Sequence, residues 1–175
     1  MTFAKDAGKP AVIVVMGVAS SGKTSLGERL AERLGWPFRD ADSFHPPVNV
    51  AKMSSGIPLT DEDRKPWLAA IAAWIDALRS SGGNGIVTCS ALKKAYRDVI
   101  VGKRPDVALV YLQGSRELIG QRMAARQHHF MPPALLDSQF ATLEEPGPNE
   151  NPLVVQVEAS KDAIVEQVVR ELRLG

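Results

Sequence analysis

The chain has 175 residues, of which 45% are hydrophobic and 23% are charged, and its formal net charge at pH 7 is +1. This length fits one domain with a substantial core, and the composition is ordinary for a globular protein. A charge so close to zero gives no basic field for nucleic acid or an anionic membrane, so we expect neither as a partner.

The sequence carries no sign of export or membrane insertion. Its N-terminus lacks the apolar core of a secretory signal, and its longest apolar run, 11–19, is too short to span a bilayer. The single cysteine, Cys89, cannot form a disulfide within the chain, which suits a reducing compartment. We therefore expect one cytoplasmic domain over residues 1–175.

The first predicted elements are a buried strand over 11–16 and a helix over 23–34, joined by a glycine-rich loop. This loop matches the pattern G-x-x-x-x-G-K-[ST] between strand and helix, where backbone N–H groups and the helix N-terminus hold a polyphosphate. We expect ATP to be bound by Gly17, Val18, Ala19, Ser20, Ser21, Gly22, Lys23 and Thr24. Lys23 would reach the β and γ phosphates, and the Thr24 hydroxyl would bind Mg²⁺. A Gly/Ser-rich turn that merely precedes a helix is the weaker alternative.

Two carboxylates follow a second short strand, which ends at residues 40–42. Open α/β sheets build their sites at the carboxyl ends of strands. The strands predicted over 86–89 and 107–112 end without an acid, so we expect Asp40 and Asp42 to serve, one to support the metal ion and the other to prepare an acceptor hydroxyl. The alternative is that one of the two only caps a turn.

The rest of the chain continues to alternate between strand and helix. A further strand is expected over 153–157. Helices are expected over 48–55, from the N-cap Thr60 to about Leu78, and over 90–101, 116–126, 135–143 and 162–172. Residues 127–133 interrupt the helical periodicity and predict a mobile loop. This order predicts an α/β fold with a parallel sheet covered on both faces.

The guanine-reading sequence Asn-Lys-x-Asp is absent from the chain, which favours a small kinase over a GTPase. Five segments together resemble the P-loop gluconate kinases: 17–24, 40–53, 56–64, 89–98 and 129–132. The resemblance implies a nucleoside monophosphate kinase-like fold with a five-stranded parallel sheet and a mobile lid at about 122–143. It also implies transfer of the ATP γ-phosphate to the 6-hydroxyl of D-gluconate with Mg²⁺, and a homodimer.

The resemblance extends to the related shikimate kinases, whose Asp-x-Asp follows the same strand, and it implies that Asp42 is the base or orienter of the acceptor hydroxyl and that Asp40 holds a metal-bound water. It also implies roles for several further residues. Gluconate needs a cation for its carboxylate and hydrogen-bonding groups for its hydroxyls. The expected substrate contacts are Asp42, His45, Lys52, Arg64, Ser90, Lys93, Arg97 and His129. The competing interpretations are a solvated helix face for Lys93 and Arg97, an ion pair with Asp61 for Arg64, and an ordinary loop position for His45.

Arg122 and Arg126 lie one helical turn apart, before residues 127–133. In relatives of this family such arginines pack on adenine and reach the transferring phosphates, so both are expected to bind ATP and Arg126 to be catalytic. The alternative is the solvated face of an amphipathic helix. His128 and His129 do not predict a zinc site, because adjacent residues point in different directions and no third ligand is near.

The sequence departs from the family pattern at two positions. Ser20 stands where the family usually has Gly, at a point where the loop needs a positive φ, and Lys65 stands where Trp is common. Two other functions are alternatives: a kinase for another small hydroxy acid such as shikimate, and a nucleotide-binding module without catalysis. The long 42–64 motif disfavours the first, and the complete set of Lys23, Thr24, Asp40 and Asp42 disfavours the second.

Overall fold

The computed structural model describes residues 9–125 and 133–174. Its five strands form one sheet in the order β2-β3-β1-β4-β5, with every pair parallel. The strands are β1 (Val12–Met16), β2 (Phe38–Asp40), β3 (Gly85–Thr88), β4 (Val107–Gln113) and β5 (Leu153–Gln156). The predicted α/β fold with a five-stranded parallel sheet is confirmed.

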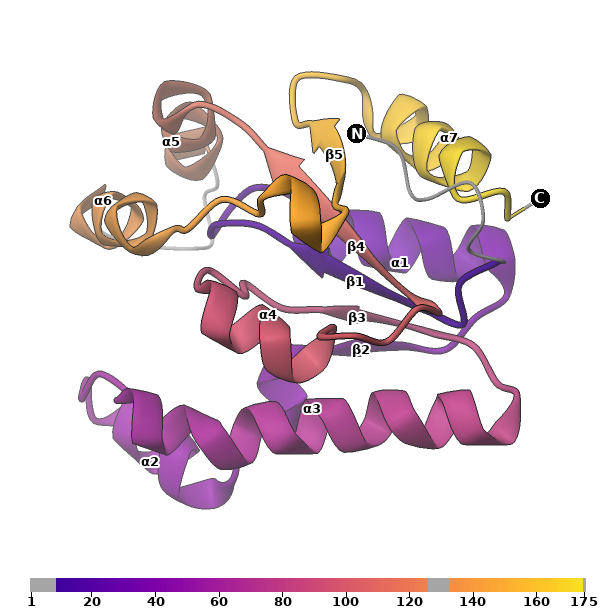
Figure 1. Ribbon diagram of the computed structural model, residues 1–175. Helices are drawn as coiled ribbons and strands as arrows, with labels where there is room; N and C mark the ends of the chain where they lie inside the picture. The colour runs from indigo at the N-terminus through magenta and orange to yellow at the C-terminus, as the bar shows by residue number, and fades with distance from the viewer. Residues whose placement is uncertain (1–8, 126–132, 175) are drawn as a thin grey trace.

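Helices cover both faces of the sheet. In Figure 1, α1 and α7 lie on one face and α3 and α4 on the other, while α5 and α6 stand together at one end. The helices are α1 (Lys23–Leu34), α2 (Pro47–Ser54), α3 (Asp61–Ser81), α4 (Lys94–Ile100), α5 (Arg116–Ala125), α6 (Pro133–Thr142) and α7 (Lys161–Glu171). Two short 3₁₀ turns, Ala41–Phe44 and Pro148–Glu150, complete the elements.

The central strand β1 explains why the protein has two cores. Its side chains alternate between the faces, as the period of two in a strand requires. Ile13 and Val15 join the core under α1 and α7, while Val12, Val14 and Met16 join the core under α3 and α4. All five are fully buried. This run of apolar residues holds the start of the glycine-rich loop in a fixed place.

The start of the long helix is also as predicted. Thr60 accepts a hydrogen bond from the backbone N–H of Asp63, and Asp63 accepts one from the N–H of Thr60, so the two residues form a capping box. Gly35 ends α1 in the left-handed conformation with φ of 70°, as expected of a C-cap. Short-range signals therefore set these helix ends.

The predicted helix over 90–101 is wrong at its beginning. The helix α4 begins at Lys94, and Lys93 has extended backbone angles (φ −100°, ψ 142°). Ala91 lies in the left-handed region with φ of 46°, which no residue inside a right-handed helix adopts. The segment between β3 and α4 is therefore a loop that brings Ser90 and Lys93 to the carboxyl edge of the sheet.

Within residues 9–125 and 133–174, no helix is both long enough and apolar enough to cross a bilayer. The helices predicted over 116–126 and 135–143 are present as α5 and α6. Arg126 and His129, and with them part of the lid expected at about 122–143, lie outside the described residues.

Candidate active site

The glycine-rich loop has the backbone that its sequence demands. A Cβ on Gly17 would lie 2.6 Å from the Ser21 hydroxyl and 3.2 Å from the Leu112 carbonyl oxygen, so only glycine fits there. Gly22 has a φ of 98°, and Ser20 has a φ of 64°. Ser20 thus adopts the positive φ expected at this position, at a cost of about 1 kcal/mol relative to glycine.

The start of α1 adds a positive end to this loop. Gly22, its N-cap, has no side chain that could cap the first turn, so the N-cap itself does not compete with an anion at this end of the helix. The Lys23 ammonium donates to the Val18 carbonyl oxygen over 2.9 Å, which keeps the cation folded against the loop. Backbone N–H donors beside one ammonium group are suited to binding a polyphosphate.

Thr24 and Asp40 form an oxygen pair beside the loop. The Thr24 hydroxyl lies 3.5 Å from Asp40 Oδ2, while Asp40 Oδ1 accepts a hydrogen bond of 2.9 Å from the N–H of Asp42. Asp40 therefore caps the 3₁₀ turn with one oxygen and faces Thr24 with the other. A hydroxyl and a carboxylate suit Mg²⁺, which binds few protein oxygens and takes the rest from phosphates and water. The residues present fit this ion.

Asp42 lies in a different electrostatic environment from Asp40. Burial raises the pKa of Asp42, and the neighbouring Asp40 charge raises it further, against the opposing effects of His45 and Lys23. Burial also lowers the pKa of His45, although Asp42 opposes the change. The fold thus gathers Lys23, Asp40, Asp42 and His45 at one place, and a carboxylate with a raised pKa in such a site is a candidate base.

The imidazole of His45 is held rigidly. It stacks on the ring of Trp67 with centroids 4.5 Å apart, and Trp67 donates its indole N–H to the Ala41 carbonyl oxygen over 2.7 Å. Asn49 Nδ2 lies 3.2 Å from His45 Nδ1 and also donates to the Asp63 carbonyl oxygen. The sequence analysis did not assign Trp67 or Asn49 to the site; their contacts show that they position His45.

Arg64 and Lys93 meet at one carboxylate, that of Asp61. Lys93 Nζ lies 3.3 Å from Asp61 Oδ1 and Arg64 lies 3.8 Å from it. The Tyr96 hydroxyl donates to Asp61 over 2.5 Å and accepts from Arg64. These contacts lower the pKa of Asp61, with the Tyr96 hydrogen bond contributing most. The ion pair foreseen for Arg64 is present, yet the same geometry shows that this cluster can bind a carboxylate.

Lys52 makes a different contact. Its ammonium lies 2.8 Å from Asp63 Oδ1, so it ties α2 to the capping box of α3. Ser90 lies in the loop after β3, on the edge that carries Asp42. The structure therefore brings Ser90 to the site and places Lys52 at its outer support.

The assignment of Arg97 to the substrate is corrected. Its side chain is only 2% exposed and forms an ion pair with Glu150, with Nε and Oε1 2.7 Å apart. The same guanidinium donates to the carbonyl oxygens of Ala91 and Leu92. All its contacts bind the loop before α4 to the turn at 148–150, so Arg97 is a structural residue and neither a substrate contact nor part of a solvated face.

Arg122 also lies at the carboxyl edge, but at its far side. Its guanidinium donates to the carbonyl oxygen of Val157, the residue after β5. The adenine contact predicted for Arg122 remains a prediction. Cys89, the residue after β3, is buried, and burial raises the pKa of its thiol to about 12, so it behaves as a small apolar residue.

Comparison with known proteins agrees with this geometry. The family model described as shikimate kinase matches residues 19–173. A gluconokinase of Gluconobacter oxydans (strain 621H) is 44% identical over 94% of this chain and 93% of its own. The thermoresistant gluconokinase of Escherichia coli K12 is 38% identical over 94% of both chains.

Solved structures give the same result for the fold. The crystal structure of a gluconokinase from Sinorhizobium meliloti 1021 superimposes with a TM-score of 0.83 at 44% identity, over 95% of this chain and 93% of that one. A shikimate kinase from Bacteroides thetaiotaomicron reaches a TM-score of 0.67 at 15% identity, over 93% of this chain and 98% of that one, and shares the fold.

Proposed function

Since this chain belongs to the gluconokinase family, within the wider shikimate kinase family, we propose that it phosphorylates D-gluconate at the 6-hydroxyl with ATP, giving 6-phospho-D-gluconate and ADP. The observation that supports this most is the convergence of Lys23, Thr24, Asp40 and Asp42 at one edge of the sheet, beside the Arg64–Lys93 cluster.

The phosphate side of the site holds and neutralises ATP. The loop 17–24 would bind the phosphates through its N–H groups, and Lys23 would leave Val18 to meet the β and γ oxygens. Thr24 and Asp40 would hold Mg²⁺, Asp40 through water, and the ion would offset charge on the phosphate oxygens. Arg122 and Arg126 complete the proposed ATP contacts, with Arg126 meeting the transferred phosphoryl group.

On the acceptor side, Asp42 accepts the proton of the 6-hydroxyl as the oxygen–phosphorus bond forms and the bond to the leaving ADP oxygen breaks. The raised pKa of Asp42 makes its carboxylate a stronger base than an ordinary aspartate. Arg64 and Lys93 bind the substrate carboxylate. His45, Ser90 and His129 contact the hydroxyl groups, and Lys52 supports this wall through Asp63.

Kinases for other small hydroxy acids are disfavoured by the relatives. Seven gluconokinases from bacteria, animals and a slime mould are 38–45% identical to this chain over at least 81% of it, whereas the shikimate kinase structure is 15% identical. A non-catalytic module would not need Asp42 with a raised pKa beside a complete phosphate site.

The test is ADP release from Mg-ATP with D-gluconate, measured beside shikimate, glucose and no acceptor. Turnover that depends on gluconate alone is the expected result. Turnover with shikimate instead would leave the phosphate chemistry in place and overturn the substrate. Binding of ATP without turnover on any acceptor would favour the non-catalytic module.

We also propose that the protein is a cytoplasmic homodimer, as the family resemblance implies. Exposed apolar side chains on α2, among them Val48 and Val50, give this helix a surface that a second chain could cover. Light scattering of the purified protein should give the mass of two chains, and the mass of one would refute the dimer.

A further inference from the structure

One N–H group of the phosphate loop is engaged by a side chain from a distant helix. The N–H of Ala19 donates to Oε1 of Gln139 over 2.6 Å, across 120 residues of sequence. Gln139 belongs to α6, and nothing in the sequence analysis or in the proposed function gives it a role. The glycine-rich loop therefore has the carboxamide of Gln139 as a direct neighbour.

Gln139 is a polar residue in an apolar stripe. Leu136 is fully buried, and Phe140 and Leu143 pack against the same core. These three residues follow the i, i+4, i+7 spacing of one helix face, which is the face that α6 turns inward. Gln139 lies on that face between these side chains. An amide turned inward costs free energy unless it is hydrogen-bonded, and a leucine there would serve packing better. The glutamine is therefore explained by its contact with the loop.

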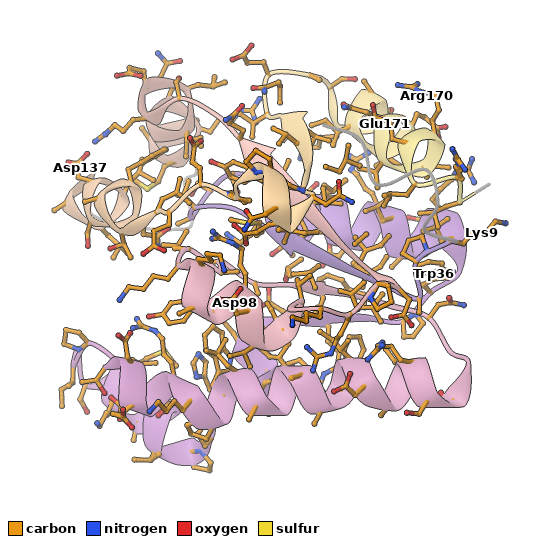
Figure 2. The ribbon with its side chains drawn as sticks, viewed as in Figure 1. Lys9, Trp36, Asp98, Asp137, Arg170 and Glu171 are labelled. Atoms are coloured by element: carbon orange, nitrogen blue, oxygen red, sulfur yellow. The ribbon has the colours of Figure 1, made fainter. Side chains whose placement is uncertain are left out.

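The position of α6 does not depend on Gln139. Arg116 of α5 pairs with Asp137 over 2.6 Å, and Figure 2 shows Asp137 on the outer side of α6. At the other end of α6, the N–H of Glu144 donates to the Leu92 carbonyl oxygen, and the Glu144 carboxylate accepts from the N–H of Lys94. Leu136 is buried as well, so these contacts already hold α6 in place. The hydrogen bond between Ala19 and Gln139 is therefore not needed to position the helix.

The peptide unit between Val18 and Ala19 relates Gln139 to the transferred phosphoryl group. Its carbonyl oxygen accepts from Lys23 Nζ, and its N–H donates to Gln139. Lys23 is the cation that meets the β and γ phosphates in such loops. Because this peptide unit is trans, its C=O and N–H point in opposite directions, so Lys23 and Gln139 contact the same stretch of the loop from opposite sides.

A fixed carboxamide oxygen leaves the amide nitrogen available. With Oε1 on Ala19, Gln139 Nε2 still carries two N–H donors, and residues 9–125 and 133–174 provide no acceptor for them. We propose that Gln139 is a catalytic residue: it keeps its bond to the Ala19 N–H, leaving the phosphates to the other N–H groups of the loop, and donates from Nε2 to the γ-phosphoryl oxygens of ATP. This inference rests on the proposed phosphotransfer and adds a neutral donor to it.

A neutral donor at this position would stabilise the charge that develops during phosphoryl transfer. Charge spreads over the equatorial oxygens of the phosphoryl group as it passes to the acceptor, and donors already in place stabilise it. Gln139 itself forms and breaks no covalent bond. Removing one preorganised donor of this type lowers kcat by about a hundredfold or more.

The experiment compares Gln139→Leu and Gln139→Glu with Ser138→Ala, an exposed neighbour on the same helix. Measured are kcat with gluconate, the Kd of ADP and of a non-hydrolysable ATP analogue, and Tm. Gln139→Leu should lower kcat about a hundredfold and leave ADP binding within twofold. Gln139→Glu can still accept from Ala19 but sets a negative oxygen against the γ-phosphate. Gln139→Glu should therefore also raise the Kd of the ATP analogue at least tenfold relative to the Kd of ADP. Ser138→Ala should match the parent protein.

Three results would overturn the proposal. Tighter binding of the ATP analogue by Gln139→Leu would mean that the side chain is a plug that ATP must displace. Equal losses of affinity for ADP and for the ATP analogue, with a lower Tm, would mean that Gln139 only holds α6 against the loop. Unchanged kcat would remove it from the reaction. If the parent protein shows no gluconate turnover, the proposed function fails, and the analogue-to-ADP ratio, which needs no acceptor, still decides the Gln139 contact.

Discussion

The two sides of the site are built in different ways. The phosphate side is built around a run of backbone N–H groups between a fully buried strand and a helix, with Lys23, Thr24 and Asp40 beside it. The acceptor side consists of long side chains from separate segments, and Arg64, Lys93 and Asp61 are 32%, 34% and 62% exposed. Every nucleotide presents the same phosphates, whereas acceptors differ, so the fold fixes the first side and leaves the second to individual residues.

This comparison gives a rule for variants. Changes on the acceptor side should alter turnover or the KM of gluconate while ATP still binds. Changes in the contacts that support that side should instead alter the free energy of unfolding.

Replacing Asp42 should separate the two sides most sharply. Asp42→Asn keeps the size of the side chain and removes the base, so kcat should fall at least about a hundredfold while the Kd of ATP stays within a few-fold. Steady-state kinetics and calorimetric titration with ATP measure the two quantities. Lys23→Ala is the matched case on the phosphate side and should weaken ATP binding and turnover together. Near-normal turnover of Asp42→Asn would remove Asp42 from the mechanism.

Arg97 tests whether a cation near the acceptor side can be purely structural. Arg97→Met leaves Glu150 buried without its partner and should lower the free energy of unfolding by about 3–5 kcal/mol. Urea denaturation at pH 7 measures this. The KM of gluconate for the folded fraction, assayed at low temperature, should stay within twofold. A tenfold rise in KM with unchanged stability would restore Arg97 to the substrate.

Arg64 should show the opposite behaviour. Its side chain is partly exposed and its ion pair with Asp61 is long, so Arg64→Ala should change stability by less than about 1 kcal/mol. Loss of a hydrogen bond to the substrate carboxylate should raise the KM of gluconate about 10- to 100-fold. Lys65→Ala, one residue on and exposed, is the control. Equal KM values for the two variants would move the carboxylate site elsewhere.

The smallest effect is expected at the capping box that supports the acceptor side. The hydrogen bond from Lys52, followed by that from the Thr60 N–H, lowers the pKa of Asp63 to about 2. A depressed folded-state pKa adds stability above the ordinary value of 3.8, and this contribution is lost as the pH falls toward 2. The stability difference between the parent protein and Asp63→Asn should therefore shrink from pH 5 to pH 2.5 in urea titrations. A constant difference would contradict this linkage.

Sequence patterns predicted what short-range physics decides. The loop 17–24, the bounds of α1 and the Thr60–Asp63 cap all depend on residues within one helical turn of one another. The strands were predicted because a parallel strand covered on both faces is an uninterrupted apolar run. The loop at the centre of the phosphate side is contiguous in sequence, and for that reason it was predictable.

The remaining features depend on distant partners. Charged residues on a helical pattern indicate a solvated face, and only Glu150, 53 residues away, reveals that Arg97 is buried. Asp61 and Tyr96 meet across 35 residues, and Gln139 reaches Ala19 across 120. The left-handed Ala91 went unforeseen because alanine rarely adopts that conformation, and the carbonyl bonds of Arg97 hold it there.

The central position of β1 has a consequence for biosynthesis. This strand emerges from the ribosome before its two neighbours in the sheet, β3 and β4, which end at Thr88 and Gln113. At translation rates of 5–20 residues per second, the loop after β1 waits for about 5–20 s before its sheet can close. During that time five apolar residues of the nascent chain stay unpaired, which is the kind of segment that chaperones bind. The segment that binds the phosphates is thus made early and becomes functional late.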